Sequence, residues 1–314
     1  MPGPIRYHRK RALRGAPSPG WSRAPGLRRM TKVGIVTDSV ACLPHEMATQ
    51  HGIRVIPVRL TVEGRVYRDR ADELPPPLIR SLQQAPSIDT TPWTPAFYCR
   101  AYEEASATTT NIIHVVAFSQ FTSTISLARA GAAMAQESTP GLRVEVFDSA
   151  TTTMAQGFIA LAAARAAAQG KDVDDVLSEA DRVRSRVAAA FTLDSLHYLA
   201  RTGRAIRLAS WANSLLHVIP VIGLSHGQER PIALTRSRPQ AMRRLLDLVR
   251  AASVPGDPLR VAIMESGQCG HAEELQHLIE EQLHPAECIV IRVSPVTQIV
   301  AGPGLLGVAF YSGD

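Results

Sequence analysis

The sequence predicts an α/β protein with two α/β domains, the first with a mainly parallel sheet flanked by helices and the second with a mixed sheet. Between residues 30 and 170, short β-branched runs alternate with helical patterns, which is typical of a parallel sheet. The composition, 45% hydrophobic and 20% charged, is that of a globular protein. A length of 314 residues exceeds one average domain and allows two. No apolar run reaches about 18 residues, so no membrane-spanning helix is predicted.

The predicted first domain covers residues 30–170. Leu43-Pro44 opens its first helix, because proline suits the first helical turn, and Gly52 closes it. Thr94-Pro95 opens another helix in the same way, and an alanine-rich helix ends near Gly170. The strands predicted between these helices are residues 33–37, 54–62, 112–118 and 142–147.

The predicted second domain covers residues 171–314 and has a different pattern. Asp172 caps a charged helix that ends near Val187. Paired strands around Ser225-His226-Gly227 predict a hairpin, and hairpins require antiparallel pairing, so this sheet is predicted to be mixed. The remaining predicted strands are residues 188–193, 259–264, 288–293 and 308–311, and helices are predicted at 195–201, 242–249 and 275–283.

The positive charge of the chain is concentrated in its first 29 residues. The whole chain carries +6, but residues 1–29 hold eight basic residues and no acidic one. The remainder therefore has 26 basic against 28 acidic residues, a net charge of −2, and needs no nucleic-acid partner. Residues 1–29 are rich in Pro, Gly and Arg and lack the apolar segment of a secretory signal, so we expect a disordered basic tail.

Cysteine and histidine usage predicts a cytoplasmic protein without a metal. The four cysteines, Cys42, Cys99, Cys269 and Cys288, form no C-x-x-C pair, and we expect reduced thiols. The ten histidines show no metal-ligand spacing. We therefore expect no metal and no cofactor.

Two short motifs match enzyme signatures but lack the secondary structure that each signature requires. Residues 223–227 match G-x-S-x-G, which in a hydrolase requires a strand, a sharp turn and then a helix. Here a second β-like run follows Ser225, so we expect a hairpin turn. Residues 302–307 match G-x-G-x-x-G, but a dinucleotide fingerprint must open a helix, and only seven strand-like residues follow Gly307. We expect a tight backbone turn there.

Hydroxyl-rich turns follow three of the predicted strands. They are Thr37-Asp38-Ser39, residues 119–124 and residues 148–153, and Thr90-Thr91 precedes a helix. In an open α/β sheet such turns share the carboxyl edge, where ligands bind, and helix N-termini attract anions. The pattern favours a bound carboxylate or phosphate over bond cleavage, although helix N-capping alone also enriches Ser, Thr and Asp at these positions.

The sequence resembles the DegV family of fatty-acid-binding proteins across residues 31–312. Residues 37–44 resemble T-D-S-T-A-x-L-P, residues 90–95 resemble T-S-Q-P-S-P, and residues 119–124 resemble S-G-L-S-G-T. Later blocks follow in the family order: Val146 to Ser149 with Gln156-Gly157, Leu196 to Ile206 with Gly203-Arg204, Arg236-Ser237-Arg238, and Gly302-Pro303-Gly304. The ordered set is far more specific than any one block.

The resemblance implies two α/β domains with an acyl chain buried inside or between them. It also implies that the carboxylate is held by the hydroxyls of Thr90 and Thr122, which lie 32 residues apart, with Ser39 and Ser123 beside them. The apolar wall of the tunnel is expected from residues that otherwise would serve as ordinary core: Phe118, Phe121, Ile125, Met154, Phe158, Ile159, Leu215 and Leu216.

Some members of the family present the acid to a kinase that phosphorylates its carboxylate. Here Val300 stands where many members have a histidine, and Ile219 replaces a lysine, so the resemblance supports this partnership less than it supports binding. The resemblance also implies a basic rim near the carboxylate, with ordinary solvated arginines as the alternative; its members would be Arg201, Arg204, Arg236 and Arg238.

The function predicted from the sequence is that of a non-catalytic carrier of a long-chain fatty acid. Two alternatives stay open at this point. One is an esterase that uses Ser225 with His226, and the other is a nucleic-acid-associated protein that acts through the basic tail.

Overall fold

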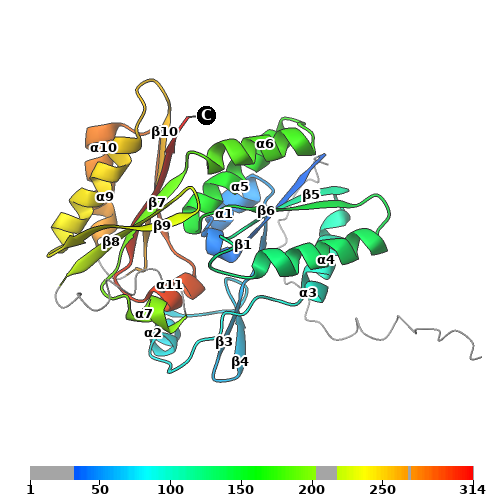
Figure 1. Ribbon diagram of the computed structural model, residues 1–314, viewed down its shortest axis with the longest axis horizontal. Helices are drawn as coiled ribbons and strands as arrows, with labels where there is room; N and C mark the ends of the chain where they lie inside the picture. The colour runs from blue at the N-terminus through cyan, green and yellow to red at the C-terminus, as the bar shows by residue number, and fades with distance from the viewer. Residues whose placement is uncertain (1–31, 203–217, 268–269, 314) are drawn as a thin grey trace, which may run out of the picture.

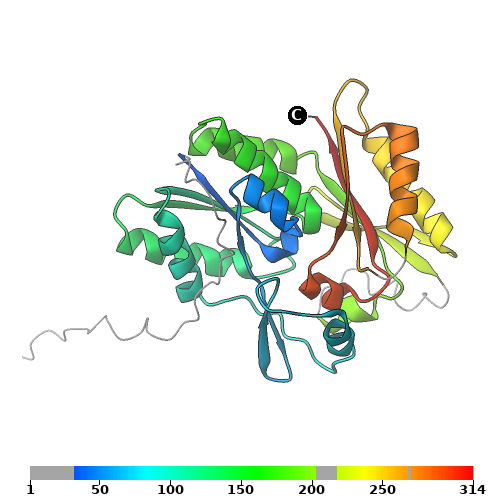
Figure 2. The same cartoon turned by 180° about the vertical axis from the view of Figure 1, so that it is seen from behind.

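The computed structural model describes residues 32–202, 218–267 and 270–313, and places them in two large sheets and one small one (Figures 1 and 2). The predicted tail, residues 1–29, lies outside the described residues. In the described part of the chain, no helix is long and apolar enough to cross a membrane.

The first large sheet is parallel and has four strands in the order β2-β1-β5-β6. Its two central strands, β1 and β5, are buried on both faces, as expected for a parallel sheet between helices. In β5, for example, Ile112 faces one cluster while Ile113 and Val115 face the other. The strands are β1 (Gly34–Asp38), β2 (Arg54–Ile56), β5 (Asn111–Val116) and β6 (Arg143–Asp148).

Helices cover both faces of this sheet. On one face α3 (Pro95–Ser106) packs against α4 (Thr124–Ser138), and Gly131 lets the two helices approach closely, because a Cβ there would lie 2.7 Å from the carbonyl oxygen of Pro95. On the other face lie three helices, which are α1 (His45–Gln50), α5 (Thr153–Ala168) and α6 (Val173–Arg184).

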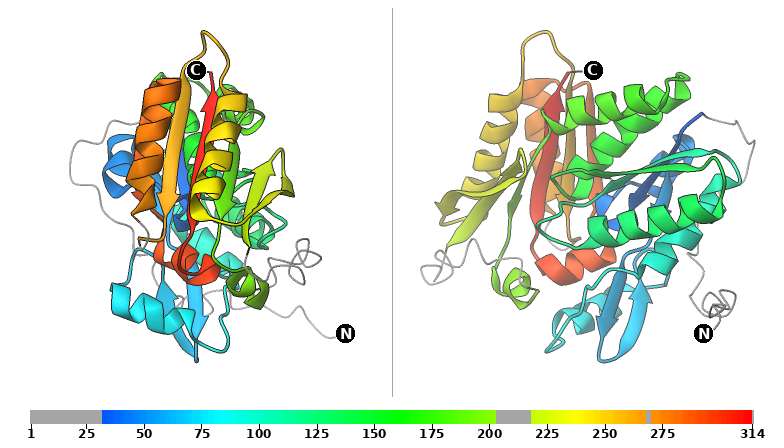
Figure 3. Two further views of the ribbon diagram at one scale, coloured as in Figure 1. Left: turned by 90° about the vertical axis from the view of Figure 1, so that its left-hand side faces the viewer. Right: turned by 45° about the vertical axis from the view of Figure 1, so that its right-hand side comes forward.

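The second large sheet is mixed and has six strands in the order β11-β10-β12-β7-β8-β9. Only the pair β10 and β11 is parallel; the other neighbours are antiparallel. Its outer face is covered by α9 (Arg238–Ala252) and α10 (His271–Leu283), as Figure 3 shows. The strands are β7 (Ala188–Thr192), β8 (Ile219–Ser225), β9 (Gln228–Thr235), β10 (Leu259–Glu265), β11 (Glu287–Arg292) and β12 (Leu306–Ser312).

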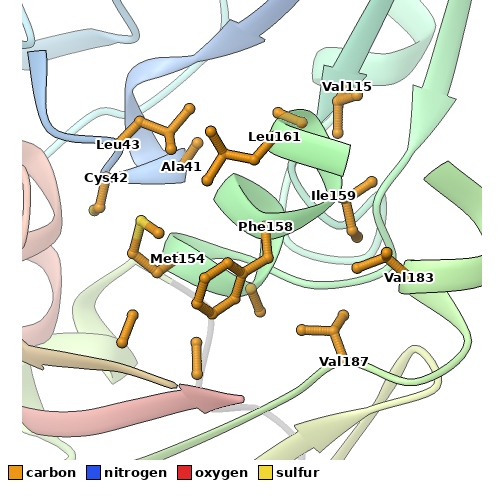
Figure 4. Packing of buried hydrophobic residues seen from close by; sticks show 14 of the residues in the cluster. Ala41, Cys42, Leu43, Val115, Met154, Phe158, Ile159, Leu161, Val183 and Val187 are labelled. Atoms are coloured by element: carbon orange, nitrogen blue, oxygen red, sulfur yellow. The ribbon is translucent and has the colours of Figure 1, made fainter. Parts of the chain in front are cut away.

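Helix α5 joins the two sheets. A helix that is apolar all round must be buried all round, and the alanine-rich α5 packs against both the parallel sheet and the inner face of the mixed sheet. Phe158 lies 5.3 Å from the ring of Tyr311 on β12, measured between ring centroids. Figure 4 shows Met154, Phe158 and Ile159 projecting from α5 into this interior. One hydrophobic cluster therefore spans both halves of the chain, and the predicted boundary at residue 170 stays a prediction.

A small third layer lies at one end of both sheets. It contains the antiparallel hairpin of β3 (Arg59–Val62) and β4 (Arg65–Arg68), which projects from the body in Figure 1. The hairpin packs on three short helices through a cluster that includes Leu60, Ile79 and Val300. These helices are α2 (Pro76–Gln83), α7 (His197–Arg201) and α11 (Pro295–Ala301).

The predicted fold class is confirmed, and the differences are local. The strand predicted at 54–62 is two strands in different sheets, because the chain leaves the parallel sheet at Pro57. Helices α2 and α11 escaped prediction. Both have proline in the first turn, and Ser294 caps α11 by accepting from the backbone N–H of Thr297, so a capping signal was present in the sequence.

Candidate ligand-binding site

A cavity of about 170 Å³ lies where the carboxyl edge of the parallel sheet meets the inner face of the mixed sheet. The turns after β1, β5 and β6 form one side, and residues of β7, β8 and α11 form the other. Most of its wall is apolar. The apolar wall residues are Val40, Val58, Pro92, Trp93, Ala117, Phe121, Phe191, Leu193, Leu199, Ile222, Leu224, Val296, Val300, Ala301 and Leu305.

The polar part of the wall consists mainly of hydroxyl groups. Three side chains of the wall are charged in their ionised forms: Asp38, Arg59 and Glu229. The hydroxyl-bearing residues are Thr90, Tyr98, Thr122, Thr124, Thr152, Thr153 and Thr297. A wall of this kind suits a ligand with a long apolar body and a small polar group.

Thr122 is positioned by the first turn of α4. Its Oγ1 accepts from the backbone N–H of Thr124 at 3.2 Å and lies 2.8 Å from Oγ1 of Thr124. Thr122 precedes the N-cap residue Ser123, and its bond satisfies the first backbone N–H of α4. A hydroxyl has one proton and two lone pairs, so Thr122 still has capacity to donate to a ligand when Thr124 does not receive its proton.

Thr90 lies within an ordered turn that is closed by the side chain of Asp89. The carboxylate of Asp89 accepts from the backbone N–H of Thr91 at 2.8 Å and from its hydroxyl. Asp89 is also paired through its backbone with Thr61 of β3. These bonds fix the backbone on both sides of Thr90, whose half-buried side chain belongs to the cavity wall.

Asp38 places a buried carboxyl group in the wall. Its Oδ2 accepts from the backbone N–H of Ala117 at 3.0 Å and its Oδ1 from that of Val40 at 3.1 Å, which ties the end of β1 to the end of β5. Burial raises the pKa of Asp38 to about 6 in spite of these bonds. Burial, and then the Asp38 charge, raise the pKa of Tyr98, which is a neutral phenol at physiological pH.

Asp38 predicts a pH dependence of stability that is opposite to that of a typical paired carboxylate. Its pKa is raised from 3.8 to about 6 on folding, so its stabilising contribution is complete below pH 3.8 and is lost as the pH rises through 6. We expect the stability advantage of the wild type over Asp38→Asn to fall by about 2 kcal/mol between pH 4.5 and pH 7. Urea titrations of both proteins at the two pH values measure it, and a difference that is flat or grows with pH would contradict the assignment.

A family model described as "uncharacterised protein, DegV family" matches residues 32–313. The chain belongs to the DegV family. The resemblance found in the sequence is thereby confirmed. Among its relatives, a DegV domain-containing protein of Caldanaerobacter subterraneus subsp. tengcongensis is 25% identical over 281 residues, which cover 90% of this chain and 99% of the relative.

Two solved structures of the family share the fold. A DegV family protein of Thermus thermophilus, described by its fatty-acid binding, has a TM-score of 0.81 and 26% identity and covers 90% of this chain and 99% of its own. DegV of Bacillus subtilis, described as a fatty acid binding protein, has a TM-score of 0.77 and 26% identity, with 90% and 100% covered. The match extends over both sheets of the present structure.

The structure brings three of the predicted ligand-binding residues to the cavity: Thr90, Phe121 and Thr122. Phe118 lies behind the wall, with its ring 5.1 Å from that of Phe121, and the Ser123 side chain is exposed. Leu216, with Leu215, lies outside the described residues.

Two further predicted residues support the site from behind. Ser39 is buried, and its Oγ accepts from the backbone N–H of Val58 at 3.0 Å, so it positions a wall residue without lining the cavity. Phe158 is packed in the cluster between the sheets and does not line the cavity; Met154 and Ile159 share its helix and that cluster. The sequence could not separate core from wall on a helix that is apolar all round.

None of the three predicted rim arginines that the structure describes lines the cavity. Arg238 pairs with the carboxylate of Asp194 and donates to the carbonyl of Gly304. Arg201 donates to the carbonyl of Ala85 at 2.6 Å, and Arg236 is exposed. Arg204 lies outside the described residues. A basic rim therefore stays a prediction.

The two misleading motifs have the conformations expected of turns. His226 and Gly227 have φ values of 51° and 65° between the paired residues Ser225 and Gln228, which is a two-residue hairpin turn and not a strand-to-helix elbow. The glycine motif connects α11 to β12 with positive φ at Gly302 and Gly304, and no helix follows it. Within the described ranges, no group of three or more His, Cys, Asp or Glu side chains could hold a metal ion.

The sequence reasoning missed much of the wall. Tyr98 lies in the helix predicted after Thr94-Pro95, and Arg59 in the strand predicted at 54–62; neither was expected to line the site. The residues of β7, β8 and α11 come from the other half of the chain, and only the packing of the two sheets brings them to the threonines. The sequence did contain a signal for Asp38, because this residue belongs to the hydroxyl-rich turn after β1.

Proposed function

We propose that this protein is a non-catalytic carrier of a long-chain fatty acid. The acyl chain would occupy the cavity between the sheets, and the hydroxyls of Thr90 and Thr122 would hold the carboxylate. The observation that carries the proposal is a largely apolar cavity with both threonines in its wall, in a fold whose Thermus and Bacillus relatives are described as binding fatty acid.

The acyl chain and the carboxylate of the ligand contribute different amounts of binding free energy. Burying about 14 methylenes gives a gross gain of roughly 11 kcal/mol, at about 0.8 kcal/mol each. Each hydroxyl bond to a carboxylate adds about 1.5–3 kcal/mol, and ordering the ligand reduces the total. The chain therefore sets most of the affinity, and the threonines determine where the carboxylate lies.

The wall chemistry favours binding over catalysis. Ser225 lies at the start of a hairpin turn, and that backbone lacks the helix that a nucleophile elbow requires. This removes the structural basis for the esterase alternative. The nucleic-acid alternative depends on residues 1–29, which lie outside the described part.

A fatty-acid kinase is the partner that the family resemblance suggests. Val300, at the position of the family histidine, is part of the cavity wall and offers only an apolar contact to a phosphorylated headgroup. Ile219 at the start of β8 supplies no charge. A carrier without this kinase partner fits these residues better.

We also propose a cytoplasmic location. It is supported by the thiols of Cys42, Cys99 and Cys288, which are free in the part of the chain that the structure describes.

Native mass spectrometry of the purified protein tests the proposed function. We expect a mass adduct of a fatty acid, or uptake of added oleate or palmitate at one equivalent per chain. The Ala301→Phe variant, designed to fill the cavity, is the control. A protein that carries no lipid and takes up neither acid would contradict the proposal.

A further inference from the structure

Arg59 belongs to the cavity wall, and its guanidinium lies near the residue that precedes Thr90. Arg59 is the first residue of β3, and Arg59 and Thr90 both line the cavity. Its Nη2 lies 3.7 Å from Oδ2 of Asp89, and Asp89 directly precedes Thr90. Consecutive Cα atoms lie about 3.8 Å apart, so the guanidinium and Thr90 belong to the same part of the wall. The Arg59 side chain is 28% exposed, which places it near solvent and not in the deep interior.

The positive charge of Arg59 is only loosely compensated. Arg68 lies directly opposite it in the β3–β4 hairpin, and two like charges in such a pair repel each other. Asp72 compensates Arg68 closely, with Nη2 to Oδ1 at 2.7 Å and Nε to Oδ1 at 3.0 Å. The contact of Arg59 with Asp89 is longer, at 3.7 Å, and the Asp89 carboxylate also accepts two hydrogen bonds from Thr91.

The charged groups of the wall include one base and two acids. Among the described wall residues, Arg59 is the single cation, and Asp38 and Glu229 are the acids. Glu229 belongs to β9 and is paired with Leu224, next to the hairpin turn of the mixed sheet. An anionic headgroup is attracted to a positive charge, so Arg59 favours a carboxylate in the part of the wall that it shares with Thr90.

We propose that Arg59 is a specificity-determining residue that selects the ionised acid over neutral lipids of the same chain length. The inference rests on the proposed function, because it concerns the headgroup of the ligand proposed there. Arg59 orients the carboxylate toward Thr90 and Thr122 and leaves the contacts of the acyl chain unchanged. Its contribution depends on ligand charge, whereas that of the two hydroxyls depends on hydrogen bonding.

Comparing an acid with a neutral lipid of equal chain length tests the inference. Dissociation constants for oleate and oleyl alcohol would be measured at pH 7.5 for the wild type, Arg59→Gln and Arg59→Lys. We expect Arg59→Gln to weaken oleate binding about tenfold and oleyl alcohol binding less than about twofold, as for one charged contact. Arg59→Lys should retain most of the preference for oleate, and the loss in Arg59→Gln should shrink as salt is raised from 50 to 500 mM.

Arg65→Gln is the matched control, because Arg65 lies in the same hairpin, is exposed and does not line the cavity. It removes the same charge and should leave both dissociation constants within about twofold. Equal losses for oleate and oleyl alcohol in Arg59→Gln, or no loss for either, would overturn the role of Arg59 while leaving the carrier function intact. A wild type that binds neither lipid would overturn both.

Discussion

Replacing both Thr90 and Thr122 with alanine is expected to weaken oleate binding about 100-fold or more, and methyl oleate binding less than about fivefold. Two hydroxyl bonds to a carboxylate contribute about 1.5–3 kcal/mol each, and 1.4 kcal/mol corresponds to a factor of ten. The ester carries no charge and gains less from the same donors, while its chain buries the same apolar area. Fluorescence displacement titrations with both lipids measure the two losses.

Further variants separate the loss of hydrogen bonds to the ligand from a loss of protein stability. Thr122 also accepts from the backbone N–H of Thr124 at the start of α4, and losing such a hydrogen bond costs about 1 kcal/mol of stability, so melting temperatures of the variants must be compared. Thr90→Ser with Thr122→Ser keeps both hydroxyls and should retain binding within about tenfold. Thr152→Ala is a control within the wall, because Thr152 lines the cavity without belonging to the proposed pair. If the double alanine variant lost the same affinity for the acid and for the ester, the two threonines would not be the groups that hold the carboxylate.

Ala301→Phe is expected to abolish the binding of long-chain acids while leaving the fold intact. Ala301 lies at the end of α11 and lines the cavity, so an added ring has empty space to enter. A ring that displaces about six methylenes removes about 5 kcal/mol of burial, more than a thousandfold in the dissociation constant. Octanoate, whose chain is shorter, should be affected less than palmitate. Isothermal titration with both acids measures the difference.

Ala272→Phe is the matched control for this variant. Ala272 is fully buried in the cluster of α9, α10 and the outer face of the mixed sheet, away from the cavity. The same substitution there overpacks a filled core and should lower the free energy of unfolding by about 1–3 kcal/mol. Ala301→Phe should keep or raise it. If Ala301→Phe bound palmitate as the wild type does, the cavity would not be where the acyl chain lies.

The order of the elements could be predicted from the sequence because it depends on local patterns. The apolar, β-branched runs of β1, β5 and β6 and the proline-started helix after Thr94 can be recognised without tertiary information. The break at Pro57 was missed because residues 54–62 are uniformly β-like around it. Helix α11 has only seven residues, too few to establish a helical period.

The two sides of the cavity differ in how far the sequence reveals them. The position of Thr122, Thr152 and Thr153 follows from the topology, since parallel strands bring the turns after β1, β5 and β6 to one edge. The opposite side depends on how the mixed sheet packs across α5, and neither Phe191 nor Leu224 has a local pattern that predicts a cavity wall. The place of Arg59 in the wall could not be predicted either, because the sequence around it has only the pattern of an ordinary β-strand.

A crystal structure of the protein with bound oleate would show where the acyl chain and the carboxylate lie. We expect the acyl chain between the turns of the parallel sheet and strands β7 and β8. Its carboxylate oxygens should lie about 2.7–3.2 Å from the hydroxyls of Thr90 and Thr122. Oleate in the opposite orientation, with its methyl end at the threonines, or seated on the surface with the cavity unoccupied, would contradict this expectation.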